Sequence, residues 1–377
     1  MVNGELKVSK DVLLWDETLF SNGEILEFDY LPEYFAHRDS QMQALRFSLK
    51  PALRGMRPVN CLVKGPPGTG KTTAVIKVFN EMKEYTDNVV FVKVNCQMDS
   101  TRFAVVSRIY EQLVHINPPT SGVAFRRLFE KVIKYLLDAN KTLVVALDDI
   151  NYLFPEGHAD EVMYSLLRAH EQYPGAKISV IAIISDVGIP YSFDPRVGSV
   201  FLPEEVAFPR YELSEIADII DNRAKHAFYQ DVVSDEAKDK VVSYVGRTGD
   251  LRIGIDLLKR SGLNAERRAS RIISVEDVDK AYEASRLLHL CRNIKSLSDH
   301  EKTLLGMIAK DNSLQTGELY KSFHEITGLG YTRFYEIIEK MYASRLIDAD
   351  FSGKGTRGRT RYVAPVYDSK DILKCLE

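Results

Sequence analysis

The chain has 377 residues, 45% of them hydrophobic and 27% charged, and this ordinary globular composition excludes collagen-like, low-complexity and wholly disordered polymers. At about 150 residues per domain, it has room for two or three domains. Lys and Arg total 50 against 53 Asp and Glu, which gives a net charge of −3. Any nucleic-acid surface must therefore be a local basic patch.

No apolar run approaches the length that a membrane helix needs, and the acidic N-terminal residues are unlike a signal peptide. We therefore expect a cytoplasmic protein without a membrane partner. The four cysteines lie far apart and have no metal-ligand spacing. In a reducing compartment, all four are expected to be buried thiols, namely Cys61, Cys96, Cys291 and Cys375.

The first half of the chain predicts an α/β domain. Residues 1–29 have little periodicity and are expected to form an N-terminal arm. In the base domain that follows, residues 30–207, short apolar runs alternate with amphipathic stretches. Strands are predicted at 59–63, 88–94, 142–147 and 178–184, and helices at 72–84, 101–115, 122–139 and 158–173. This alternation indicates a parallel sheet with helices on both faces.

The second half predicts two further domains. Residues 208–293 show helical patterns at 213–229, 235–245, 251–268 and 275–290, with a capping box from Ser274 to Asp277. Residues 294–377 show helical patterns at 299–310, 316–326 and 331–344, and Ser298 and Glu301 form a second capping box. Two strands at 346–351 and 360–363 flank a Gly-rich basic loop. Three helices and a basic hairpin are typical of a winged helix-turn-helix.

Residues 65–72 read Gly-Pro-Pro-Gly-Thr-Gly-Lys-Thr and fit the P-loop pattern G-x-x-x-x-G-K-[ST] between a strand and a helix. The glycines let backbone N–H groups converge on phosphate oxygens, and the helix N-terminus favours an anion. Lys71 is expected to meet the β- and γ-phosphates, and the Thr72 hydroxyl to ligate Mg²⁺.

The strand at 142–147 is followed by two carboxylates, Asp148 and Asp149. About 80 residues after a P-loop, they predict a Walker-B site. Asp148 is expected to hold Mg²⁺ through water, and Asp149 to orient the attacking water. The alternative is a strand that merely ends in acidic residues facing solvent.

With these features, the sequence resembles the AAA+ ATPases, and its C-terminal winged helix narrows the resemblance to the archaeal origin-recognition (Orc/Cdc-type) replication initiators. The resemblance runs from about residue 30 to residue 367. Four further segments carry it: Tyr30-Leu31-Pro32-Glu33 with His37-Arg38-Asp39, Asp194-Pro195-Arg196-Val197, Phe208-Pro209-Arg210-Tyr211 with Arg223, and Gly249-Asp250-Leu251-Arg252.

The resemblance implies a role for each segment. The first would lie over the adenine, Arg196 would be an arginine finger acting in cis or in trans, and Arg252 would reach the γ-phosphate from the lid, so that the lid responds to that phosphate. For Arg196 and Arg223 the alternative is a surface charge. The nucleotide contacts implied in full are Leu31, Pro32, His37, Arg38, Pro67, Gly68, Thr69, Gly70, Lys71, Thr72, Thr73, Ala74, Tyr211, Arg223 and Arg252.

Two departures from the family pattern concern hydrolysis. The family usually has Glu after the Walker-B Asp, whereas here Asp149 is one methylene shorter. The sensor-1 position usually holds Asn, and the best register places Ser185 there, with one donor and a shorter reach. Both changes predict a slow ATPase that acts as a switch rather than a motor.

Three segments are candidate DNA contacts. The basic loop contributes Lys354, Arg357, Arg359 and Arg361, which fit phosphates or a minor groove. The third helix of the winged domain, expected to be the recognition helix, contributes Thr332, Arg333 and Tyr335, with Phe334 and Ile338 in the core. Arg126 and Arg127 occupy the place of a helical insert that the family uses against DNA, and a solvated helix face is the alternative.

These features predict an ATP-dependent initiator that binds double-stranded origin DNA, associates with other initiator subunits there, helps to recruit or load the replicative helicase, and is nucleoid-associated. Its cofactors would be ATP or ADP and Mg²⁺. Two alternatives stay open: an ATP-gated winged-helix transcription regulator, and an AAA+ loader that acts mainly through protein contacts. The basic loop argues against the second.

Overall fold

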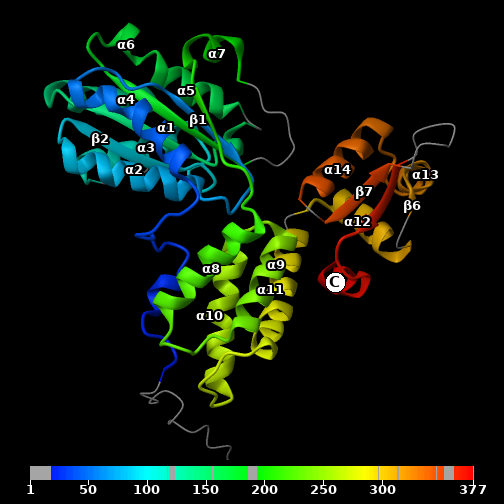
Figure 1. Cartoon of the computed structure of the whole chain (residues 1–377). Coiled ribbons are helices and arrows are strands. Elements are labelled where there is room, and N and C mark those ends of the chain that lie inside the picture. The colour runs from blue at the N-terminus through cyan, green and yellow to red at the C-terminus, as the bar shows by residue number, and fades with distance from the viewer. Residues whose placement is uncertain are drawn as a thin grey trace, which may run out of the picture. The chain divides into compact units, whose positions relative to one another are not determined.

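The computed structural model of the chain describes residues 18–116, 118, 124–154, 157–185, 193–295, 297–311, 314–344, 346–351 and 361–376. Among these residues, no helix is both long and apolar enough to cross a membrane. The chain divides into two compact units, and Figure 1 labels many of the helices and strands described below. One holds the described residues up to Ala36 together with Tyr211–His289, and the other holds His37–Arg210 and the C-terminal part from Leu290.

A five-stranded parallel sheet forms the base, as predicted, in the order β2-β3-β4-β1-β5. Its strands are β1 (Cys61–Gly65), β2 (Val89–Asn95), β3 (Thr142–Asp148), β4 (Ile178–Ser185) and β5 (Glu204–Ala207). The strand β5 was not predicted, because it is four residues long and begins with two glutamates. β3 is buried along its whole length, which explains its continuous apolar sequence.

Helices cover both faces of this sheet, so the predicted fold class is confirmed. Phe79 of α2 (Lys71–Tyr85) packs against Phe91 on one face of β2, with the two rings tilted by 39°. Val92 and Val94 point to the other face, where they join the large core with α3 (Arg102–Val114), α4 (Phe125–Asp138) and α5 (His158–Leu167). Alternate residues of a strand point to opposite faces, which makes this two-sided burial possible.

Three helices of the base differ from the predictions. The predicted helix at 158–173 is interrupted at Arg168, whose φ and ψ are −100° and 11°, and continues as the short α6 (Ala169–Gln172). Two helices were not predicted: α1 (Asp39–Leu49) and α7 (Pro195–Phe201). The N-terminus of α7 is capped by the side chain of Asp194, which accepts from the Arg196 N–H.

The lid unit packs four helices: α8 (Leu213–Ala227), α9 (Asp235–Thr248), α10 (Leu251–Arg267) and the first part of α11 (Val275–Lys295). The predicted arm shares their core from residue 19 onward, with Leu19, Ile25 and Leu26 buried among lid residues. The short helix η2 (Gly23–Leu26) lies in this segment. At the start of α11, the Asp277 carboxylate accepts from both the backbone N–H and the hydroxyl of Ser274.

The C-terminal part is a winged helix by its elements: α12 (Asp299–Asp311), β6 (Leu314–Gln315), α13 (Thr316–Thr327), α14 (Tyr331–Ala343), β7 (Ile347–Phe351), β8 (Arg361–Pro365) and α15 (Ser369–Leu376). The three strands pair in the order β6-β8-β7. Phe334 and Ile338 are fully buried in its core, as expected. The capping box is reciprocal, because Ser298 N–H donates to Glu301 and Glu301 N–H donates to the Ser298 hydroxyl.

The expectation of four reduced cysteines is wrong for two of them. Cys291 of α11 and Cys375 of α15 form a disulfide across 84 positions of sequence. Their spacing gives no sign of the pairing, which arises because α15 folds back onto the core that also buries Leu290 and Ile294 of α11. Cys61 and Cys96 are free and buried, and burial raises the pKa of the Cys61 thiol to about 11.

Candidate nucleotide site and DNA-binding surface

The P-loop joins β1 to α2 in a conformation that depends on its glycines. Gly68 and Gly70 have φ values of 74° and 87°, in the left-handed region that side chains with a Cβ rarely adopt. At Gly65, a Cβ would lie 2.2 Å from the carbonyl oxygen of Phe208. The backbone thus turns tightly and passes close to a neighbouring segment, which are two reasons for glycine at these positions that the sequence analysis did not state. The convergence of the loop N–H groups on phosphate oxygens stays a prediction.

Lys71 lies at the first position of α2 and is only 6% exposed. Its Nζ donates to the carbonyl oxygens of Gly65 and Pro66 at 2.7 and 2.8 Å. The ammonium group is thus held over the loop that would enclose phosphates, where a ligand oxygen can exchange with these carbonyls. The first turn continues with Thr73 and with Ala74, which is fully buried.

Arg38 supports the P-loop from behind. It is 2% exposed, and its guanidinium donates to the carbonyl oxygens of Thr69, Pro209 and His37 at 3.1, 2.8 and 2.9 Å. The Thr69 hydroxyl in turn donates to the carbonyl of Pro66 at 2.9 Å. These contacts join three separate segments of the base, so the residue predicted to touch the nucleotide also fixes the backbone of its binding loop.

Asp148 and Thr72 meet as predicted at the end of β3. The Thr72 hydroxyl donates to Asp148 Oδ1 at 2.8 Å, and the ammonium of Lys93 lies 3.8 Å from Oδ2. Burial raises the pKa of Asp148, while the Thr72 hydrogen bond and the positive charge of Lys93 act in the opposite direction. A hydroxyl and a carboxylate oxygen beside a P-loop are ligands of the type that Mg²⁺ prefers, so these residues fit that ion.

Asp149 and Ser185 are also brought together. Ser185 at the end of β4 donates its hydroxyl hydrogen to Asp149 Oδ1 at 2.6 Å. Asp149 has φ 54° and ψ 47°, a left-handed conformation that is uncommon for a residue with a side chain. Strained backbone of this kind is concentrated at functional sites. The carboxylate is therefore fixed in place by the residue that the register assigned to sensor 1.

Arg196 is exposed at the start of α7, with 78% of its side chain accessible. Its Nε and Nη2 both donate to the Asp194 carboxylate at 3.0 Å. These hydrogen bonds lower the pKa of Asp194 to about 2. The predicted arginine finger thus forms an ion pair with the aspartate two residues before it, and its side chain remains exposed to solvent.

In the lid unit, Arg252 shows the same local arrangement as Arg196. It starts α10, is 56% exposed, and donates to Asp250, the residue that caps the helix. Arg223 is instead buried, donates to the carbonyl of Ile25 at 2.7 Å and lies 4.9 Å from the centre of the Tyr30 ring. The structure thus shows Arg223 bonded inside its own unit. Nucleotide contact by Arg223, Arg252, Leu31, Pro32 and Tyr211 stays a prediction.

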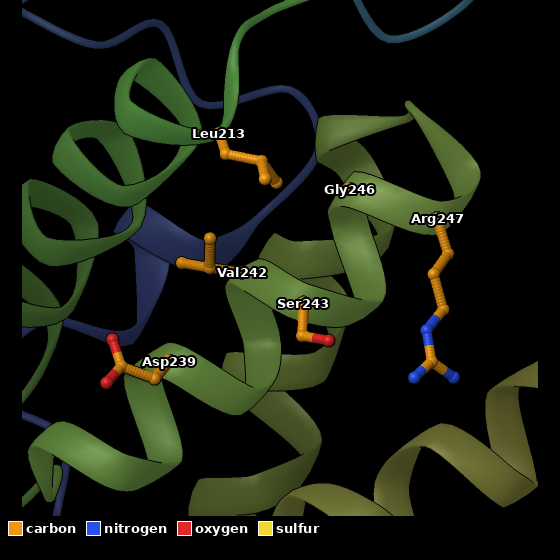
Figure 2. A pocket seen from close by; sticks show the side chains of 6 residues that line it. All are labelled: Leu213, Asp239, Val242, Ser243, Gly246 and Arg247. Atoms are coloured by element: carbon orange, nitrogen blue, oxygen red, sulfur yellow. The ribbon is translucent and has the colours of Figure 1, made fainter.

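A cavity of about 460 Å³ lies in the lid and contains none of the predicted site residues. Leu213 of α8 and residues of α9 line it, and Figure 2 shows the Leu213 side chain next to α9, with Asp239 and Arg247 on opposite sides of Val242. Gly246 lets Leu213 approach closely, because a Cβ there would lie 2.5 Å from a Leu213 methyl group. Nothing in this cavity matches the phosphate chemistry of the base.

The predicted DNA contacts are partly described. Thr332, Arg333 and Tyr335 are exposed at the start of α14, where Arg333 pairs with Glu336 at 2.7 Å. Arg126 and Arg127 are exposed on α4, and Arg126 pairs with Glu130 at 3.1 Å. Lys354, Arg357 and Arg359 lie outside the described residues, and for Arg361 only the backbone, in β8, is described.

Comparison with known proteins agrees with this geometry. Residues 34–181 match the family model of the AAA ATPase domain, and residues 217–283 match that of the Cdc6 AAA+ ATPase-type lid domain. The chain is 64% identical to ORC1-type DNA replication protein 2 of Methanosarcina mazei over 97% of this chain and 98% of that protein. This chain belongs to the ORC1-type DNA replication proteins.

Other ORC1-type proteins match it over the same length. ORC1-type DNA replication protein 3 of Haloarcula marismortui is 48% identical over 97% of this chain and 98% of that protein. Among solved structures, the Aeropyrum pernix ORC1 protein in complex with DNA has a TM-score of 0.74 at 26% identity, and covers 96% of this chain and 97% of that one. The ORC1-type chain thus carries an AAA+ nucleotide-binding domain, and it is a replication initiator protein by family.

Sequence reasoning missed one charged residue of this ORC1-type site. Lys93 lies near the end of β2, and no motif marks it, but it lies beside the Walker-B carboxylate. The available signal was weak: a lone lysine within the apolar run of β2, two residues before the strand ends. Parallel strands end at the same edge of a sheet, so such a residue is a candidate for the site at that edge.

Proposed function

We propose that the chain is an ATP-dependent initiator that binds double-stranded origin DNA, changes state with bound ATP or ADP, and helps to recruit or load the replicative helicase. The observation that carries this proposal is the meeting of Lys71, Thr72 and Asp148 around a P-loop in a chain that is similar to ORC1-type replication proteins along nearly its whole length.

In this proposal, Thr72 and Asp148 would hold Mg²⁺, which would supply positive charge against the phosphates of the nucleotide. Lys71 exchanges the carbonyls of Gly65 and Pro66 for phosphate oxygens. Hydrolysis is slow, because the short carboxylate of Asp149 is already engaged by Ser185 and is poorly placed for an attacking water. Turnover of tens of ATP per second by the protein alone would contradict this.

The winged helix supplies the proposed DNA contacts. Exposed Thr332, Arg333 and Tyr335 at the start of α14 suit base edges or phosphates, and the basic loop suits phosphates. The Aeropyrum pernix ORC1 structure contains DNA, which supports this proposal. Exposed Arg196 would act on a neighbouring initiator subunit assembled on the same DNA.

The test is affinity for origin and random duplexes across a salt series, with footprinting on the organism's own replicon. Replacing Arg357 and Arg359 together with Ala should weaken binding to all sequences and reduce the salt dependence by roughly two units of slope. Arg333→Ala should act more strongly on origin DNA if it reaches a base edge. Lys370 and Lys374, exposed on α15, provide a matched double-alanine control.

Full origin affinity with an unchanged slope after the loop substitutions would contradict DNA binding by the winged helix, and would favour a loader that acts through protein contacts. Footprints confined to promoters, with no protection at origins, would favour a transcription regulator.

A further inference from the structure

Lys93 belongs to the same face of the sheet as the Walker-B carboxylate. Residues paired across parallel strands point to the same side, as do residues two apart along one strand. Asn95 pairs with Asp148 in the register of β2 and β3, and Lys93 precedes Asn95 by two residues. Phe91, two residues earlier still, packs against Phe79 of α2, the helix that starts with the P-loop lysine. The strand therefore directs Lys93 to the P-loop side of the sheet.

The backbone at Lys93 is fixed although β2 is an edge strand. The side chain of Gln112 in α3 bonds both backbone groups of Lys93: its Nε2 donates to the carbonyl at 2.8 Å, and its Oε1 accepts from the N–H at 3.3 Å. This double contact protects the open strand edge, and it sets the point from which the lysine side chain extends.

The ammonium of Lys93 faces Asp148 and is 3.8 Å from its Oδ2. The other oxygen of the same carboxylate accepts the Thr72 hydroxyl at 2.8 Å. Asp148 is 7% exposed, so its charge is costly without a nearby cation. Lys93 itself is 38% exposed and can move into solvent. The carboxylate thus has one fixed partner and one displaceable cation.

We propose that Lys93 is a positioning residue that balances the charge of Asp148 in the metal-free site and competes with Mg²⁺ for that carboxylate. The inference rests on the proposed Mg²⁺ role of Thr72 and Asp148. When Mg²⁺ binds, Lys93 must withdraw or remain as a like charge nearby, so this lysine weakens Mg²⁺ binding and makes it dependent on ionic strength. The nucleotide-bound site then passes more easily between metal-bound and metal-free states.

The test uses the full-length protein loaded with a fluorescent ADP analogue and titrated with Mg²⁺, with a parallel measurement of ADP affinity in EDTA. Lys93→Met should lower the dissociation constant for Mg²⁺ by about three- to tenfold at low salt, since a divalent ion no longer faces a nearby cation. Lys93→Arg keeps the charge and should behave like the wild type. Lys64→Met is the matched control, because Lys64 is an exposed strand lysine of the same sheet paired with Glu205.

The outcomes separate the inference from the proposed function. If the ADP-bound wild type binds no Mg²⁺, the proposed metal role fails. If the wild type binds Mg²⁺ and Lys93→Met matches it, the inference on Lys93 alone is overturned. The same holds if Lys93→Arg or Lys64→Met tightens Mg²⁺ binding as much as Lys93→Met does. The inference is supported if only Lys93→Met binds Mg²⁺ more tightly than the wild type and if this difference in Mg²⁺ affinity decreases at high salt.

Discussion

The cationic residues at the P-loop and the arginines at the starts of α7 and α10 differ in how they are held. Lys71 and Arg38 are buried, and donate to carbonyl oxygens of the binding loop and of segments far away in sequence. Arg196 and Arg252 are exposed, and each pairs with an aspartate two residues earlier.

This difference indicates that the two groups of residues would contribute to nucleotide affinity in different ways. The buried cations are positioned by the base before any ligand arrives, so they can contribute to affinity without reordering. Arg196 and Arg252 each have a local carboxylate partner. If they bind phosphate as proposed, the phosphate must replace that partner, and the net contribution to affinity is the difference between two ion pairs. We therefore expect large effects from changes at the P-loop and graded, ligand-dependent effects from changes at the helix starts.

Lys71→Ala should have the largest effect. It removes the positive charge that the loop places near the phosphates, and nucleotide affinity should fall by roughly 100-fold or more. Titration with fluorescent ADP measures this loss. Lys83→Ala, an exposed lysine in the last turn of the same helix, is the control and should bind normally. Wild-type affinity in Lys71→Ala would remove the P-loop lysine from the binding site.

Arg38→Met should lower stability in the absence of nucleotide. It leaves buried carbonyls of Thr69 and Pro209 without their donor, which should cost about 2–4 kcal/mol in the free energy of unfolding. Urea denaturation measures the change. Arg46→Met provides the comparison, because Arg46 lies on the adjoining helix α1 in an exposed pair with Glu81 and should cost about 1 kcal/mol or less. Equal losses in both variants would show that burial of Arg38 has no special role.

Arg252→Ala should reduce the affinity for ATP more than the affinity for ADP, because only ATP has a γ-phosphate. Since Arg252 is more than half exposed and must leave Asp250, we expect a difference of about 1–2 kcal/mol, roughly five- to thirtyfold in affinity. Competition binding of both nucleotides measures it. Arg260→Ala is the matched control on α10, as Arg260 pairs with Asp256 one turn away. Equal losses for ATP and ADP would assign Arg252 a structural role.

Asp250→Asn should have the smallest effect and the opposite sign. The amide oxygen can still cap α10, but it holds the guanidinium less tightly than a carboxylate does. ATP affinity should rise about two- to threefold while ADP affinity stays the same. A loss of ATP affinity would mean that Asp250 orients the Arg252 guanidinium towards the phosphate rather than competing with the phosphate for it.

The sequence predicted the fold through its strongest periodic signals. The four apolar strands of the base and the long amphipathic helices of the lid appear within a few residues of their predicted positions. The strand β5 and the helix α7 were missed because four and seven residues carry too little periodicity. The break at Arg168 was missed because both sides of it have buried apolar residues, so the pattern continues across it.

The sequence also identified the P-loop and the Walker-B carboxylates, because their chemistry requires fixed residue types at fixed spacing, and their contact with a nucleotide stays a prediction. It did not predict that Ser185 would bond Asp149, that Arg38 would brace the loop, or that Lys93 would face Asp148. Each of these contacts joins residues more than thirty positions apart. The strand order β2-β3-β4-β1 brings Lys93 and Ser185 to the carboxylates that follow β3, whereas Arg38 reaches the P-loop from the N-terminus of α1.

The sequence by itself determined the P-loop, the two carboxylates after β3 and the succession of α/β base, helical lid and winged helix. Motif spacing and hydrophobic periodicity depend only on residues that are close together in the sequence, so both can be recognised without the fold. Only the tertiary structure decided which polar groups share a carboxylate, which arginines are buried, and that Cys291 joins Cys375. Those outcomes depend on the order of the strands in the sheet and on which distant helices pack into the same core. Long-range packing, rather than local propensity, sets both.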